Sequence, residues 1–200
     1  MAMTVYEDAI KFHGHACPGL AIGYRVAELA LRELGAKRSY DEELVAIVEN
    51  NSCAVDAVQV ATGCTFGKGN LIYRDYGKQV YTFVLRPSGK ALRIAVDWKH
   101  PEDTPEEAEA WRRYSEGDRT EDVAKIVHER KSKKMQAVLD CPEAEMFKLT
   151  PLEIKPPEAA RIYRSLRCAR CGEKTMEPRM RLLRGRTLCL PCFGTEEGES

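Results

Sequence analysis

Hydrophobic residues recur at two different spacings along the chain, and these spacings separate the predicted helices from the predicted strands. Between Pro18 and Leu34 the apolar positions recur every three or four residues, as in an amphipathic helix. Shorter apolar, β-prone runs bounded by polar or turn residues predict strands. The predicted helices are Thr4–Phe12, Pro18–Leu34, Ala54–Ala61, Pro105–Tyr114 and Thr120–Val138; the predicted strands are Leu44–Glu49, Leu71–Tyr76, Val80–Arg86, Ala91–Val96 and Met146–Ile154.

The order of these elements predicts an α+β fold, with helices packed on a mainly antiparallel sheet. Arg86–Lys90 has the composition of a turn and predicts an antiparallel hairpin. We assign residues 1–155 to a core domain, residues 156–166, which begin with Pro156 and Pro157, to a linker, and residues 167–200 to a small second domain. A chain of 200 residues is long enough for this arrangement.

Composition and charge exclude several classes of function. The chain has 31 basic and 31 acidic residues, so no overall field favours nucleic acid or membrane. No apolar run approaches the roughly 20 residues of a membrane span, and Met1–Asp8 lacks the basic and apolar regions of a signal peptide. We therefore expect a cytoplasmic protein without a membrane partner, in which eight cysteines indicate metal or redox chemistry.

The segment His13–Gly19 holds two of the four histidines and one cysteine. Such donors at this spacing suit a transition metal, or a cysteine nucleophile with a neighbouring base. Pro18 fits the first position of a helix, which places Cys17 at the N-cap, where the helix dipole favours a thiolate. The alternative is a helix end with hydrogen-bonded histidines and a cysteine that only fills the core.

A second group of candidate residues lies on and after the short predicted helix. Cys53 and Asp56 share one helix face, and Cys64 returns to that face if the turn continues. Alternatively, Asp56 caps the helix or faces solvent, and both cysteines are buried. In the loop that follows, we expect Lys68 to hold an anionic substrate group or to be a solvated turn residue; a nucleotide P-loop is excluded because Gly69 follows the lysine.

Three segments, His13–Arg25, Cys53–Gln59 and Thr62–Asn70, closely resemble the FmdE family, which takes its name from formylmethanofuran dehydrogenase. The resemblance covers the amino-terminal two thirds of the chain. It implies an α+β core, usually dimeric, with a site around the histidine and cysteine motifs, and often a zinc finger behind the core. The family's motif residues correspond to His13, His15, Cys17, Cys53, Asp56, Gln59, Cys64 and Lys68.

From the residues and the resemblance we predict a Cys/His site in the core. Its candidate catalytic residues are Cys17, His15, Asp56 and Lys68, and its candidate ligands for a second transition metal are His13, His15, Cys17, Cys53 and Cys64. Asp56 can instead orient an imidazole, and spacing does not decide whether two of the thiols form a reversible disulfide.

The resemblance implies a redox or accessory role related to formylmethanofuran dehydrogenase in one-carbon metabolism, in a homodimer. A small anionic substrate is expected from Lys68. The reaction stays open between an oxidoreductase and an accessory protein of that enzyme. We favour an accessory or divergent role, because the sequence shows neither pterin-binding machinery nor a ferredoxin-type run of cysteines.

The carboxy-terminal cysteines form two Cys-x-x-Cys pairs, Cys168 with Cys171 and Cys189 with Cys192, a spacing typical of structural Zn²⁺. Disulfides and an iron–sulfur centre are the alternatives. Arg179–Leu188 predicts a β-hairpin that turns near Arg184 and Gly185, and a helix after it gives the order of a treble-clef finger.

The residues from 161 to 186 carry eight Arg and one Lys against two Glu, an excess of seven positive charges. Such a patch can meet nucleic acid or an acidic protein, but we favour a solvated face, because no base-reading aromatic residues interleave the arginines. The competing function is a non-catalytic metal sensor or adaptor whose finger binds nucleic acid or a protein partner. We expect His100 and His128 to be surface residues.

Overall fold

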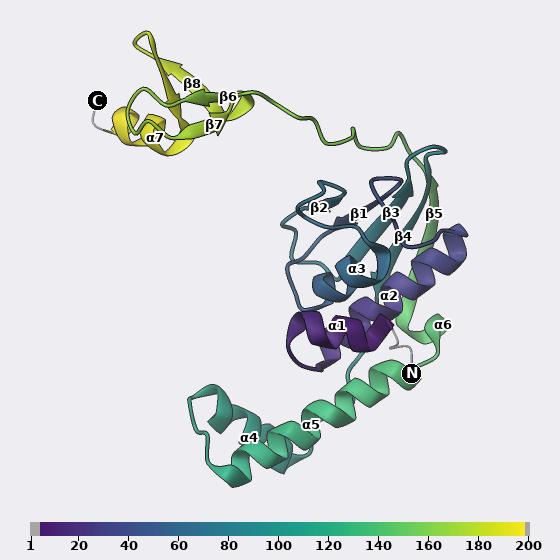
Figure 1. Cartoon of the computed structure of the whole chain (residues 1–200). Helices are drawn as coiled ribbons and strands as arrows, with labels where there is room; N and C mark the ends of the chain where they lie inside the picture. Colours follow the sequence, from purple (N-terminus) through teal and green to yellow (C-terminus); the bar gives the residue numbers. More distant parts are fainter. Residues whose placement is uncertain (1–4, 199–200) are drawn as a thin grey trace. The chain divides into compact units, whose positions relative to one another are not determined.

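The computed structural model describes residues 5–198, which form two compact units that divide between Ala159 and Ala160 (Figure 1). Thr4, the predicted start of the first helix, and the last two residues of the predicted finger lie outside the described residues. Within that described range, no helix is both long enough and apolar enough for a bilayer crossing.

The first unit is built on a five-stranded sheet. Its strands are β1 (Leu44–Val48), β2 (Leu71–Tyr73), β3 (Val80–Leu85), β4 (Lys90–Val96) and β5 (Phe147–Glu153). The strand order is β2-β1-β3-β4-β5, and only the β1–β2 pair of this sheet is parallel. A parallel pair needs a crossover, which α3 provides here. The predicted α+β fold with a mainly antiparallel sheet is therefore confirmed.

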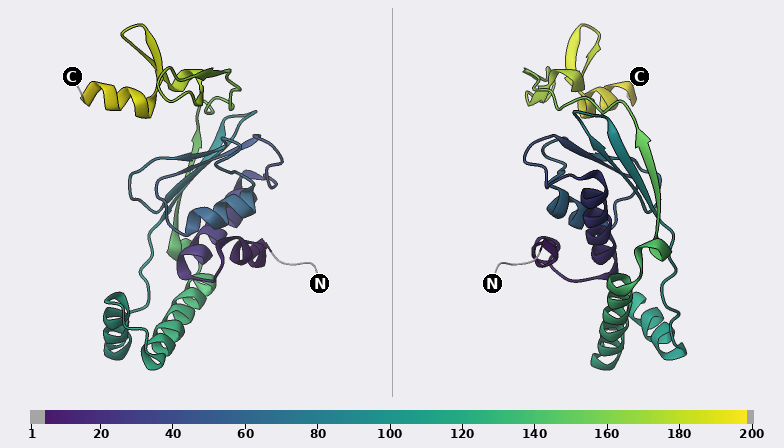
Figure 2. Two further views of the ribbon diagram at one scale, coloured as in Figure 1. Left: turned by 60° about the vertical axis from the view of Figure 1, so that its left-hand side comes forward. Right: turned by 90° about the vertical axis from the view of Figure 1, so that its right-hand side faces the viewer.

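Helices α2 (Pro18–Leu34) and α3 (Ala54–Thr62) lie on one face of this sheet, and α1 (Val5–His13) packs on these two helices on the side away from the sheet, as the right-hand view of Figure 2 shows. Apolar side chains of α2, including Val26 and Leu29, pack in one core with strand residues such as Phe83 and Ile94. Burial of this helix stripe against the sheet, more than helix propensity, stabilises the layer.

Gly23 allows α2 and α3 to approach closely. A Cβ atom at Gly23 would lie 2.0 Å from the backbone oxygen of Ala54, a distance no side chain tolerates. Only glycine therefore fits at this crossing. The contact holds the start of α3, with Cys53 and Asp56, next to the turn that joins α1 to α2.

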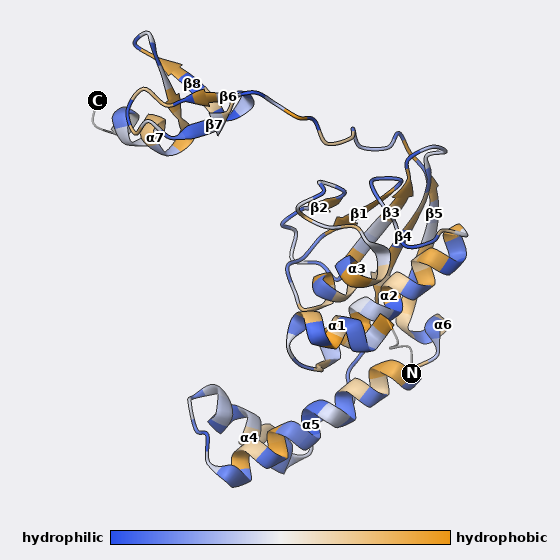
Figure 3. Cartoon of the chain, in the orientation of Figure 1, coloured by the Kyte–Doolittle hydropathy of each residue, from blue (hydrophilic) through white to orange (hydrophobic). Residues whose placement is uncertain are grey.

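Helices α4 (Pro105–Ser115) and α5 (Glu121–Asp140) form a helical hairpin. Figure 3 shows mostly hydrophilic residues along α5 and apolar residues toward its end near α6 (Glu143–Met146). Arg25 of α2 anchors that end, because its Nη1 donates hydrogen bonds to the carbonyl oxygens of Val138 and Cys141, both at 2.6 Å. The guanidinium thus satisfies carbonyl groups that the helix end leaves without partners.

The second unit follows the order of a knuckle, a hairpin and a helix that the sequence predicts. Its elements are β6 (Ser165–Arg167), β7 (Lys174–Met176), the 3-10 turn η1 (Glu177–Arg179), β8 (Met180–Leu183), β9 (Arg186–Cys189) and α7 (Leu190–Gly198). Arg184 and Gly185 both have positive φ, as a two-residue hairpin turn requires. Because β6 pairs with β7, the finger begins before residue 167, inside the range assigned to the linker.

Candidate metal centres

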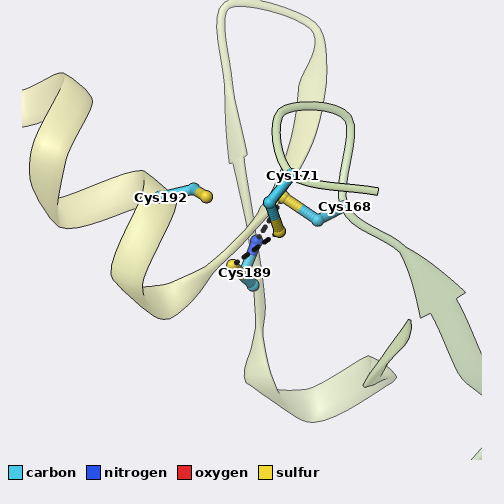
Figure 4. Close-up of side chains that lie close together, drawn as sticks. All are labelled: Cys168, Cys171, Cys189 and Cys192. Atoms are coloured by element: carbon cyan, nitrogen blue, oxygen red, sulfur yellow. Dashed lines mark hydrogen bonds between the residues drawn. The ribbon is translucent and has the colours of Figure 1, made fainter. Parts of the chain in front are cut away.

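The four cysteines of the second unit converge from the knuckle, β9 and α7 (Figure 4). Their sulfur atoms all lie within 4.8 Å of one another, and the sulfurs of Cys171 and Cys189 are 3.8 Å apart. Tetrahedral zinc with Zn–S bonds of about 2.3 Å requires sulfur pairs about 3.8 Å apart. The cysteines therefore fit a closed, four-coordinate Zn²⁺ site, and zinc there would supply folding energy and no open position for a substrate.

Backbone hydrogen bonds prepare Cys168 for metal binding. Its sulfur accepts the amide hydrogens of Cys189 at 3.4 Å and Arg170 at 3.5 Å. Backbone donors, that of Cys189 foremost, lower the pKa of Cys168 to about 6. Since the thiolate is the form that ligates zinc, this knuckle favours the ligand over the thiol.

The second cluster lies in the first unit, at the turn between α1 and α2. The ligand atoms of His13, His15 and Cys17 lie within 4.8 Å of one another. Gly14, with φ of +92°, reverses the chain after α1, and Cys17 occupies the N-cap of α2, where its sulfur accepts the amide hydrogen of Leu20 at 3.4 Å. The predicted N-cap at Cys17 is thus confirmed.

Asp56 holds the ring of His13. The Asp56 Oδ2 atom lies 2.7 Å from Nδ1 of His13, whose other ring nitrogen, Nε2, lies 3.8 Å from the Cys17 sulfur. The His13 side chain is 12% exposed and that of Asp56 36%, so the imidazole is largely shielded from water and the carboxylate remains partly solvated. A carboxylate on one ring nitrogen fixes the tautomer and directs the other nitrogen toward a metal or a thiol proton.

Cys53 lies beside this cluster. A Cβ atom at Gly19 would be 3.9 Å from the sulfur of Cys53 and 4.0 Å from that of Cys17, so Gly19 keeps the space between the two sulfurs open. Burial, followed by the charge of Cys17, raises the pKa of the Cys53 thiol. Cys53 is therefore a protonated neighbour of Cys17 when no cation is bound.

The structure does not bring Cys64 to the cluster. Gly63 ends α3 with φ of +71°, so the helical turn that would return Cys64 to the Cys53 face does not continue. Cys64 is fully buried in the main core, its sulfur donates to the Leu44 carbonyl oxygen at 3.3 Å, and burial raises its pKa to about 11. It acts as a small core residue, the alternative that the sequence left open.

Lys68 also lies away from the cluster. Its Nζ atom donates to three backbone carbonyl oxygens, those of Ser39 at 3.4 Å, Tyr40 at 3.2 Å and Asp41 at 2.8 Å. Gln59, another motif residue, accepts the amide hydrogen of Phe66. Both side chains fasten loops to one another, so the expected role of Lys68 in holding an anion is not supported.

His128 is exposed, as the sequence predicts, and the structure adds that it lies near His15. It lines a cavity of about 350 Å³ together with His15, Ala16, Lys131, Ser132 and Met135. The positions 128, 131, 132 and 135 lie on one face of α5. Their helical spacing is visible in the sequence, but nothing local indicates that this face lies next to His15.

An α+β core with a histidine and cysteine cluster, followed by a four-cysteine finger, is the class that fold and sites define. Residues 12–148 match the family described as FmdE, molybdenum formylmethanofuran dehydrogenase operon, and the chain belongs to this family. Residues 161–198 match the prokaryotic dksA/traR C4-type zinc finger, which supports the assignment of the four cysteines as a zinc-binding site.

Two relatives are informative. A curated protein of Archaeoglobus fulgidus, named probable S-adenosyl-L-methionine-binding protein, is 37% identical over 204 residues; the match includes 94% of this chain and 52% of that protein. The chain thus spans about half the length of this relative. A crystal structure of a tungsten formylmethanofuran dehydrogenase FmdE-like protein from Syntrophus aciditrophicus has a TM-score of 0.58 and 24% identity, and the match covers 95% of this chain and 92% of that one. This likeness shows a shared fold.

Proposed function

We propose that the first unit binds a divalent transition metal through His13, His15 and Cys17. The observation that carries the proposal is the convergence of these three ligand atoms within 4.8 Å, with Asp56 fixing one imidazole. Three protein ligands are typical of catalytic metal sites, which keep a position open for water or substrate. A metal held by these residues would supply a Lewis acid for a small molecule. The family's description, which names a formylmethanofuran dehydrogenase operon, supports an accessory or enzymatic role in one-carbon metabolism.

Metal content of the full chain tests this proposal. We expect two metals per chain in protein purified without chelator, one in the finger and one in the core. Cys17→Ala should reduce the content to one, whereas Cys64→Ala, which alters a cysteine away from the cluster, should leave two. A content of one in the unaltered chain, or of two in Cys17→Ala, would overturn it. Co²⁺ in place of the native metal adds a thiolate absorption band that Cys17→Ala should weaken.

The same geometry favours a second candidate, in which Cys17 acts as a nucleophile. Asp56, His13 and Cys17 form a relay in which the carboxylate orients the imidazole and the imidazole faces the sulfur. In metal-free protein, His13→Gln should slow alkylation of Cys17 by iodoacetamide, measured on the Cys17 peptide by mass spectrometry. Equal rates in the two proteins would exclude the relay.

For the finger we propose a mainly structural role. Arg164 pairs with Glu177 at 2.7 Å and Arg186 with Glu196 at 3.2 Å, so part of the positive charge is balanced within the unit. The adaptor function predicts salt-dependent DNA binding that weakens when Arg181, Arg184 and Arg186 are neutralised.

The name of the archaeal relative suggests one further ligand to test. If S-adenosylmethionine stabilises the first unit, the ligand binds in the half of the relative that this chain matches.

A further inference from the structure

The cavity beside His15 has the size and lining of a ligand site. Its volume of about 350 Å³ lies within the range of small-molecule pockets. One wall comes from the loop that carries His15 and Ala16, and the other from α5, with His128, Lys131 and Met135. A molecule in this cavity would therefore contact a side chain of the candidate metal cluster.

Lys131 lines the cavity and carries a positive charge that has no ion-pair partner among the described residues. Four basic residues follow one another closely on α5, and the three others form ion pairs with carboxylates. These pairs are Arg130–Asp103 at 2.7 Å, Lys134–Asp103 at 2.7 Å and Lys133–Glu107 at 3.2 Å. Among the described residues Lys131 has no such partner, and its ammonium lies 5.7 Å from the ring centroid of Trp111 and 5.3 Å from that of Tyr114. The rings hold the cation without neutralising it.

The other lining residues provide hydrogen-bond donors and apolar surface. His128 and Ser132 provide hydrogen-bond donors, and Met135 and Ala16 provide apolar surface. Of the described residues that line it, none is acidic. Donors and an uncompensated cation attract an oxyanion, and the apolar surface suits a short hydrocarbon segment.

We propose that this cavity binds a small organic molecule that carries a carboxylate or phosphate group, with the anionic group at Lys131 and His128 and the other end at the His13/His15/Cys17 cluster. The proposed orientation of the ligand rests on the proposed metal site, because His15 belongs to the metal cluster and also lines the cavity. The negative charge of the ligand is inferred from the cavity lining alone, so anion binding can be tested with and without metal.

Histidine-ring NMR of the full chain tests the proposal, since the sequence has only four histidines. With ¹⁵N-labelled imidazoles, titration with butyrate and with inorganic phosphate should shift the His15 and His128 signals together and saturably. His100, which packs against Trp98 and does not line the cavity, is the internal control. The probe that binds more tightly identifies the anionic group. No saturable shift of His128 with either probe would overturn the proposal.

Two matched lysine variants test whether the anion binds at a specific site or is attracted only by the overall positive charge of the surface. Lys131→Gln should raise the dissociation constant about fivefold, and Lys131→Arg should restore most of the affinity. Lys133→Gln removes the same charge two residues away and should change the constant by less than about twofold. Equal weakening by Lys131→Gln and Lys133→Gln would contradict a specific site. Thermal unfolding of each variant checks that the fold is retained.

Co²⁺ binding, measured on the same samples, keeps the two proposals distinguishable. Saturable anion binding without core Co²⁺ would sustain the anion site and overturn the metal site. Core Co²⁺ without anion binding would overturn the anion site alone. If both bind, butyrate, whose hydrocarbon end would face the cluster, should perturb the Co²⁺ spectrum in the unaltered chain, and an unchanged spectrum would refute the proposed orientation toward the cluster.

Discussion

The finger and the first unit gather metal-binding side chains in opposite ways. In the finger, four sulfurs share a unit with few buried apolar residues, chiefly Met180 and Leu188 beside two of the cysteines. In the first unit, the turn that carries His13 and Cys17 rests on a helix layer over a five-stranded sheet. We therefore expect the finger to fold only when zinc is bound. The first unit, in contrast, should fold without metal, and its fold brings the candidate ligands together.

The largest expected effect is therefore unfolding of the finger on metal removal. Structural zinc contributes about 10–16 kcal/mol in isolated finger domains, more than this small core can replace. Chelation, or Cys189→Ser, should abolish the dispersed NMR signals of residues 165–196. Signals of the first unit should persist. An ordered finger in metal-free protein would contradict the expectation that only the finger needs metal to fold.

Gly23→Ala tests whether the first unit depends on close packing of its helices and not on metal. The added methyl group would collide with the Ala54 backbone, so we expect a loss of about 3 kcal/mol or more in the stability of the first unit. Denaturant unfolding measures this loss. Gly67→Ala is the control, because its Cβ would meet no atom within 4 Å, and it should change the stability by less than about 1 kcal/mol. Zinc content of the finger should be unaffected by either variant.

Asp56→Asn should alter the core site while leaving the fold in place. Loss of a carboxylate that orients a metal-ligating imidazole costs about 10- to 100-fold in metal affinity. Competition titration with a chromogenic chelator measures this change, and the finger zinc of the same molecule is the reference. An unchanged core affinity would show that the contact between Asp56 and His13 does not serve the metal.

Lys68→Met should have the smallest effect. The variant loses donors to three backbone carbonyl groups, and we expect about 1 kcal/mol of lost stability. Core metal affinity and anion binding should stay the same. A selective loss of anion affinity would return Lys68 to the substrate-binding role that the sequence suggested.

Residues whose role depends on neighbours in sequence were predictable. Cys17 at the N-cap follows from Pro18, and the zinc ligands follow from the spacing of their two pairs. Cys64 and Lys68 belong to the same motif as Cys53, but their positions depend on how Gly63 ends α3 and on which carbonyl groups the loop meets. His128 joins His15 only through the packing of α5, which no local pattern encodes.

Arg25 anchors the helix that forms one wall of the cavity, at a point outside the cavity itself. The guanidinium fastens α5 at Val138, ten residues from His128, which is about 15 Å along the helix. A tilt of about 6° at that attachment would move His128 by about 1.5 Å, roughly the length of one covalent bond. The angle at which α5 leaves Arg25 would therefore affect the space beside His15, although Arg25 does not line the cavity.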